Sequence, residues 1–197
     1  MNLAIIGATG NVGRKIIEVL EKSRLQIDNL YLVASKKSAG KKLKFNKRDL
    51  TIEQLEKYDF SKAEITIFAA GSEIAKVWAP QAAKKTIVID NSKHFRMDKN
   101  VPLVVAEVNP NDLKSHNNII SNPNCSTIQL LLPLKPLHDA YNIKRVIVST
   151  YQAVSGAGKE AEDELFSQTK EYLDNKKIIS KNFTKQMAFN LIPHIDV

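Results

Sequence analysis

Cys125, the only cysteine of the chain, has the surroundings of a reactive residue. It lies in the segment Asn122-Pro123-Asn124-Cys125-Ser126, and an apolar helical run over 128–134 follows at once. A thiol at the first turn of a helix meets the positive end of the helix dipole, which favours the nucleophilic thiolate. A lone cysteine is more often a small buried hydrophobic residue. The loop-forming neighbours and the helix start favour a nucleophile here.

Three glycines near the N-terminus predict a dinucleotide site. Gly7, Gly10 and Gly13 follow an apolar strand at 2–6 and open a helix with apolar residues at helical spacing. Such a turn lets the backbone approach a pyrophosphate, although G-x-x-G-x-x-G departs from the commoner G-x-G-x-x-G. A glycine turn without a ligand is the alternative. Together with the cysteine, the turn suggests an enzyme that acylates its thiol and moves a hydride onto or off the acyl carbon.

The end of the second predicted strand, residues 30–34, bears on the choice of cofactor. An NAD site usually has Asp or Glu there, to bind the ribose 2′-hydroxyl. This chain has Ser35-Lys36-Lys37-Ser38 instead. A hydroxyl and two ammonium groups suit a 2′-phosphate, so we predict NADP(H) over NAD. Lys36 and Lys37 as ordinary surface lysines are the alternative.

The elements around these residues predict an α/β fold. Further strands are expected at 65–70 and 86–89, with a helix between them that Ser72 caps and that runs to Lys84. Residues 36–48 are basic and are expected to be irregular. Alternating strands and helices predict a Rossmann-like parallel sheet with helices on both faces. We assign residues 1–124 to this NADP-binding domain.

The remaining residues, 125–197, predict a second, incomplete α+β domain for substrate binding and dimerisation. The run 143–152 is rich in β-branched residues and reads as a strand. A tight loop at 155–158 follows. Residues 159–175 have apolar residues at helical spacing and acidic residues in the first turns, so a helix is expected there.

Composition places limits on the protein class. The chain has 197 residues, a net charge of +8 and one cysteine, which excludes an internal disulfide framework and suits a reducing, cytoplasmic location. We expect no signal peptide, no membrane span and no metal site. The basic residues are scattered, which argues against a nucleic-acid groove. They form a solvated surface or attract anionic small molecules.

Four motifs in one order resemble aspartate-β-semialdehyde dehydrogenase. They are residues 7–13, Asp90-Asn91-Ser92 with 95–98, residues 122–129 and residues 151–158. The resemblance covers the whole chain. It implies NADPH-dependent reductive dephosphorylation of β-aspartyl phosphate to aspartate semialdehyde, in diaminopimelate and aspartate-family amino-acid biosynthesis. N-acetyl-glutamyl-phosphate reductase shares the glycine turn and a cysteine nucleophile and ranks second. A non-catalytic NADP-binding module is the alternative from another class.

The resemblance also implies roles for individual residues. Cys125 is the nucleophile that forms the acyl-thioester, Gln152 orients the acyl group, and Arg96 binds phosphate, with Asn124 supporting the acyl oxygen. An ion pair for Arg96 and an ordinary strand-end amide for Gln152 are the alternatives. The implied cofactor contacts are Gly7, Thr9, Gly10, Asn11, Val12 and Gly13 at the pyrophosphate, Ser35, Lys37 and Ser38 at the 2′-phosphate, and Gly71, Asn91, Ser155 and Gly156 near the nicotinamide.

The chain departs from the family in two places. Lys93 and His94 stand where the family usually has small residues, and His94 is expected to be a solvated loop residue. The family's chain also continues beyond the equivalent of Val197, with a histidine acid/base in the missing part. We therefore expect an incomplete second domain and little or no activity of the chain alone. The resemblance implies a homodimer or higher assembly, which an incomplete second domain places in doubt. An interrupted gene, a fragment or a split protein would each explain this.

Overall fold

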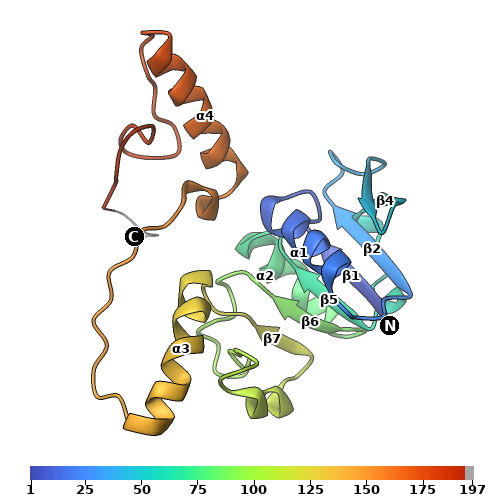
Figure 1. The fold of residues 1–197 in the computed structure, drawn as a ribbon. Coiled ribbons are helices and arrows are strands. Elements are labelled where there is room, and N and C mark those ends of the chain that lie inside the picture. Colours follow the sequence, from blue (N-terminus) through green and yellow to red (C-terminus); the bar gives the residue numbers. More distant parts are fainter. Residues whose placement is uncertain (194–197) are drawn as a thin grey trace. The chain divides into compact units, whose positions relative to one another are not determined.

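The computed structural model describes residues 1–193 (Figure 1). By their internal contacts the residues form two compact units, one over residues 1–146 and the other from residue 147 onward. His194 and the three residues that follow it in the predicted second domain lie outside the described residues. The domain boundary expected after residue 124 is not tested by these units and stays a prediction.

The first unit is built on a seven-stranded sheet. Its strands lie in the order β3-β4-β2-β1-β5-β6-β7, and all neighbours are parallel except β3 and β4. Figure 1 shows β2, β1, β5 and β6 side by side in the middle of the sheet. The strands are β1 (Asn2–Ile6), β2 (Asn29–Ala34), β3 (Lys42–Phe45), β4 (Arg48–Gln54), β5 (Ile65–Phe68), β6 (Ile87–Asp90) and β7 (Ile119–Ser121).

Two apolar clusters cover the two faces of this sheet. One contains Ile17 of α1 (Asn11–Lys22), packed with Ile5 and Leu32. The other contains the alanines of α2 (Ser72–Ala82) with Ile6 and Phe68. Small alanine side chains let α2 approach the sheet closely. The predicted parallel sheet with helices on both faces is confirmed, and the strand order reverses between β1 and β5, where folds of this kind bind ligands.

Two local predictions for the first unit were wrong. The basic segment 36–48 is not irregular, because β3 and the start of β4 form an antiparallel hairpin within it. Leu43 and Phe45 pack in an apolar cluster, while the lysines that alternate with them in β3 are exposed. Asn46 and Lys47 take the positive φ angles of a two-residue turn. Ser72 does not cap α2, since the N-cap residue is Gly71 at φ +84°.

The predicted strand over 143–152 was also wrong. Residues 142–153 form neither helix nor strand, and the Ile147 side chain is 82% exposed. Alternating β-branched residues fit a pleated surface, but a strand forms only when a neighbour accepts and donates its main-chain hydrogen bonds. Within residues 1–193 this segment has no such neighbour.

The second unit is organised by α4 (Lys159–Leu173), close to the helix expected at 159–175. A short 3-10 helix, η4 (Val154–Ala157), precedes it in place of the predicted loop. Two buried polar side chains of α4 hold the segment that follows. Glu164 accepts hydrogen bonds from the main-chain N–H groups of residues 181 and 182, and Gln168 accepts from those of 187 and 188.

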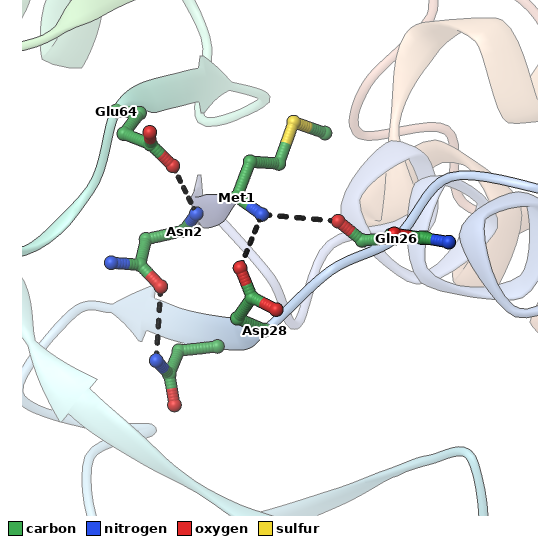
Figure 2. A network of polar contacts seen from close by, with 6 residues as sticks. Met1, Asn2, Gln26, Asp28 and Glu64 are labelled. Atoms are coloured by element: carbon green, nitrogen blue, oxygen red, sulfur yellow. Dashed lines mark hydrogen bonds and ion pairs between the residues drawn. The ribbon is translucent and has the colours of Figure 1, made fainter.

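The amino end of the sheet carries a polar network around the chain's first residue (Figure 2). The Met1 ammonium group forms an ion pair with Asp28 at 2.5 Å and donates to the Gln26 carbonyl at 3.1 Å. The Asn2 N–H donates to the Glu64 carboxylate at 2.6 Å. These contacts tie β1 to the starts of β2 and β5. Within residues 1–193, no helix is long and apolar enough to cross a membrane.

Candidate active site

The glycine turn follows β1 at the point where the strand order reverses. Gly7 has φ +85°, and a Cβ added there would lie 2.7 Å from the Ala69 carbonyl oxygen. A Cβ on Gly13 would collide with the Gly7 carbonyl oxygen. Gly7 is required for its backbone angle and because the loop after β5 approaches it closely. Gly13 is required because α1 packs against the turn at this position.

The start of α1 suits an anionic group. Its N-cap residue is Gly10, which has no side chain to cap the helix, and its first turn contains no acidic residue. A helix N-terminus of this kind presents main-chain N–H groups and a positive dipole end to a phosphate. The expected pyrophosphate contacts at Thr9, Asn11 and Val12 lie in this turn and the first residues of α1.

The turn after β2 lies next to the glycine turn. The Thr9 hydroxyl donates to the Ser38 hydroxyl at 3.5 Å, so Ser38 of the predicted 2′-phosphate site contacts the predicted pyrophosphate site. Ser35 and Lys37 are exposed. Lys36 differs, because its charge acts on a carboxylate. The pKa of Glu56 is lowered by hydrogen bonds from its own backbone and from Gln54, and to a smaller extent by the charge of Lys36. Lys37 is therefore the better placed cation for a ligand.

Gly71 completes the carboxyl edge around the switch point. It follows β5 with φ +84°, and an added Cβ would meet nothing within 4 Å. The absence of any neighbour leaves open space above this position, which the expected nicotinamide half of the cofactor would need. Asn91, the other residue of the first unit expected there, follows β6 directly and is half-buried.

Cys125 is the first residue of α3 (Cys125–Tyr141), as the sequence predicted. Asn124 is the N-cap residue, and its side-chain oxygen accepts from the N–H groups of Ser126 at 2.9 Å and Thr127 at 3.4 Å. The Cys125 side chain is exposed, so the reading as a buried hydrophobic residue is wrong. The side-chain oxygen of Asn124 therefore caps α3 by accepting hydrogen bonds from N–H groups of its first turn.

Arg96 is tied to the same loop. Its Nε donates to the Asn122 carbonyl at 3.0 Å and its Nη2 donates to the Asn91 carbonyl at 3.2 Å. The side chain is half-buried, and no ion pair involves it among the residues that the structure describes. The ion-pair alternative for Arg96 is therefore not what the described residues show. Two of its five N–H donors are used and three are left for an anion.

Sequence reasoning missed two residues beside Arg96. Asn122 donates from its side chain to the Asn91 side chain at 2.6 Å. Asp90 is fully buried and accepts from the Ser92 hydroxyl at 2.6 Å. Burial raises the pKa of Asp90, while the bonds from Ser92 oppose the rise. Asn122 stands in the motif quoted for the cysteine, whereas the burial of Asp90 required the three-dimensional arrangement.

Gln152, Ser155 and Gly156 belong to the second unit. A Cβ added to Gly156 would lie 2.5 Å from Nε2 of Gln152, so the Gln152 side chain folds over this glycine. Gln152 and Asn190 line a shallow hollow whose other walls are apolar. The apolar lining residues are Ala153, Val154, Leu165, Met187, Phe189 and Leu191. The three residues expected at the acyl group and the nicotinamide thus lie on one short segment.

The described histidines provide no further catalytic centre. His94 is exposed and its ring packs edge-on against Phe95, as expected for a loop residue. His116 accepts from the Asn118 N–H, and His138 is exposed in the last turn of α3. In residues 1–193, no three His, Cys, Asp or Glu side chains gather to hold a metal ion.

Two protein-family models match the chain. The semialdehyde dehydrogenase NAD-binding domain matches residues 2–116, and the semialdehyde dehydrogenase dimerisation domain matches residues 134–197. The aspartate-semialdehyde dehydrogenase of Aquifex aeolicus is 50% identical over 200 residues, which cover 99% of this chain and 59% of that protein. The chain thus spans about 59% of the length of this curated relative.

Solved structures show the same similarity. Aspartate semialdehyde dehydrogenase II from Vibrio cholerae, complexed with ASA, is 47% identical with a TM-score of 0.96, covering 100% of this chain and 59% of that chain. A structure of aspartate semialdehyde dehydrogenase with NADP from Candida albicans is 28% identical with a TM-score of 0.60, covering 72% of this chain and 48% of that one.

Proposed function

This chain belongs to the semialdehyde dehydrogenase family, and on that premise we propose that it supplies the cofactor site and the nucleophile for reduction of β-aspartyl phosphate to aspartate semialdehyde. The observation that carries the proposal is the hydrogen bond from Arg96 to the loop that leads into Cys125. An exposed thiol begins α3, and a half-buried guanidinium without an ion pair among the described residues is bonded to the carbonyl three residues before it.

Cys125 acts as the acyl acceptor in this proposal. Its thiolate attacks the β-carbonyl carbon of the acyl phosphate, an S–C bond forms, and the C–O bond to phosphate breaks with its electron pair leaving on inorganic phosphate. When bound, NADPH supplies the hydride that reduces the resulting thioester. Collapse of the thiohemiacetal then breaks the C–S bond, releases the aldehyde and returns the thiolate.

Arg96 binds the phosphate before and after this step. A guanidinium offers a planar fork that matches the oxygens of a phosphate, and the remaining three donors suffice for a two-point contact. Its two bonds to main-chain carbonyls fix the plane of the fork. Gln152 keeps the role that the family resemblance implies, which is to orient the acyl group. Asn124 contributes by capping α3 and so fixing the position of Cys125.

NADP(H) is the cofactor that the residues favour. The start of α1, with Gly10 as its N-cap residue and no acidic residue in its first turn, would hold the pyrophosphate, and Gly71 leaves room for the nicotinamide. Lys37 and the hydroxyls of Ser35 and Ser38 supply cationic and hydrogen-bonding groups for a 2′-phosphate, with no carboxylate at that strand end. The NADP in the Candida albicans relative supports this choice. The match of residues 134–197 to a dimerisation domain supports a homodimer as the assembled form.

The acylation half-reaction tests the proposal without full turnover. We would incubate the chain with β-aspartyl phosphate, without NADPH, and measure its intact mass. We expect one aspartyl group on Cys125, located by peptide mapping, and none on the Cys125→Ser variant. An unmodified thiol that still reacts with iodoacetamide would contradict the proposal. NADPH binding without such acylation would favour a non-catalytic NADP-binding role.

A further inference from the structure

We infer that Asn122 and Asn91 are positioning residues for Arg96, because their paired side chains fix the two main-chain carbonyls that hold its guanidinium beside the Cys125 loop. The inference rests on the proposed function, since it concerns the phosphate site of that function. It assigns Asn122 a role that neither the motif nor the expected cofactor contacts contain.

The pair joins the carboxyl ends of three neighbouring strands. Asn122 follows β7 directly, and its Nδ2 donates to Oδ1 of Asn91, which follows β6, at 2.6 Å. The Asn91 main-chain N–H and side-chain Nδ2 both donate to the carbonyl of Phe68, the last residue of β5, at 3.0 and 3.3 Å. The Asn122 N–H donates to the Asp90 carbonyl at 2.8 Å. Each asparagine is thus anchored to the neighbouring strand.

Arg96 uses the carbonyls of these same two residues. Its Nε and Nη2 donate to the Asn122 and Asn91 carbonyl oxygens. Both residues lie just beyond the strands, so no sheet ladder among the described residues holds these carbonyls. The side-chain pair therefore supplies the restraint that a ladder supplies elsewhere. The Asn91 carbonyl is held further, because the N–H of the same peptide unit, on Ser92, donates to Asp90 at 3.1 Å. The peptide after Asn122 has no such N–H, since residue 123 is proline. If the pair is broken, the Asn122 carbonyl can therefore rotate and the guanidinium loses one of its two fixed partners.

The orientation of the guanidinium matters because two-point binding of an oxyanion depends on the plane of the fork. Arg96 is bonded to the residue three positions before Cys125, so its charge acts on the surroundings of the thiol. That charge accelerates reaction of the thiol with anionic reagents relative to neutral ones, and the preference depends on where the guanidinium is held. The preference of Cys125, the only thiol of the chain, for anionic over neutral reagents thus reports where the Arg96 guanidinium is held.

The experiment uses the full 197-residue chain and two alkylating reagents, the anion iodoacetate and the neutral iodoacetamide. The quantity compared is the ratio of their rates at Cys125 at low ionic strength, where exposed charges are least screened. Arg96→Gln gives the ratio without the cation. We expect Asn122→Ala to lower the ratio by about threefold, toward the Arg96→Gln value, with the iodoacetamide rate unchanged. Asn122→Ala keeps the carbonyl and removes only the side-chain bond.

Asn109→Ala is the matched control, since it removes a side-chain amide that bonds main-chain groups of the same unit without contacting Arg96. We expect it to keep the wild-type ratio. A wild-type ratio in folded Asn122→Ala, an equal drop in Asn109→Ala, or no effect of Arg96→Gln would each overturn the inference. If Asn122→Ala does not fold, Asn122→Ser is measured in its place. Failure of aspartyl acylation with the expected alkylation ratios would refute the proposed function alone.

Discussion

Replacement of Glu164 by glutamine tests how the second unit is held together. The carboxylate is buried and accepts four hydrogen bonds, two on each oxygen. One oxygen accepts from the Lys181 N–H at 2.9 Å and Gln168 Nε2 at 2.8 Å, and the other accepts from Asn182 N–H at 2.7 Å and Nδ2 at 2.6 Å. A glutamine amide has one acceptor oxygen, so either orientation turns an NH2 group toward two donors.

The expected cost follows from the two lost bonds. A hydrogen bond to a charged group contributes about 1.5–3 kcal/mol and the losses are not additive, so we expect local destabilisation of about 3 kcal/mol. This corresponds to about a 100-fold loss of protection from hydrogen exchange. Exchange measured by mass spectrometry on peptides covering 178–190 gives the result directly. Glu160→Gln, an exposed residue of the same helix, should leave the exchange unchanged.

Acid should reproduce the effect in the unmodified chain. Burial alone raises the pKa of Glu164, but the main-chain donors of Lys181 and Asn182 and the Asn182 side chain outweigh it, so the pKa is lowered from 4.5. Its contribution to stability is therefore present above pH 4.5 and is lost as the pH falls through the lower, folded-state pKa. Hydrogen-exchange protection that is unchanged in Glu164→Gln would refute this reasoning. So would an equal loss of protection at low pH in the unmodified chain and in Glu164→Gln.

Three further changes have definite expected outcomes. Lys37→Glu should weaken NADPH binding by about tenfold and leave NADH binding nearly unchanged, because it places a negative charge near the 2′-phosphate; fluorescence titration with both nucleotides measures this. Gly156→Ala should shift the side-chain amide signal of Gln152 in a nitrogen–proton spectrum, because the new Cβ would lie 2.5 Å from its Nε2. The melting temperature should hardly change, since only a flexible side-chain end must move. The hydrogen bond to Asp28 raises the pKa of the Met1 ammonium group above 8.0, so its stabilisation is present below pH 8 and lost as the pH rises through the higher folded value. Thermal melts across this range should show that loss in the parent chain and a flatter profile in Asp28→Asn.

Local signals made part of the site predictable. The glycine turn and the start of α3 depend on residues adjacent in sequence, so spacing and capping chemistry sufficed for Gly7, Gly13 and Cys125. Arg96 was found through family resemblance. Its carbonyl partners were not predictable, because every residue has a main-chain carbonyl and the residue type does not show which carbonyl accepts a hydrogen bond. Membership of the family and the parallel sheet are confirmed, while the individual catalytic and cofactor roles stay predictions.

Longer-range structure explains what sequence reasoning missed. Lysines at alternate positions of β3 gave its segment the composition of a loop, although Leu43 and Phe45 carried the strand pattern. Glu164 and Gln168 have the composition of an exposed helix face, and they are buried because residues 179–188 fold back over them. The run at 143–152 showed the opposite case, where a strand pattern exists and its pairing partner is not among the described residues.

The edges of the sheet bear on how this chain behaves at high concentration. β3, at one edge, is lined with exposed lysines, and β7, at the other, has three residues and is covered by a bridge from Leu103 to Ser121. Charge and shortness are both devices against edge-to-edge aggregation. Within the described chain, the sheet is therefore not the part most prone to aggregation. That part is the unpaired segment at Val146, Ile147 and Val148, whose side chains are 49%, 82% and 53% exposed, and a charged substitution there should improve solubility most.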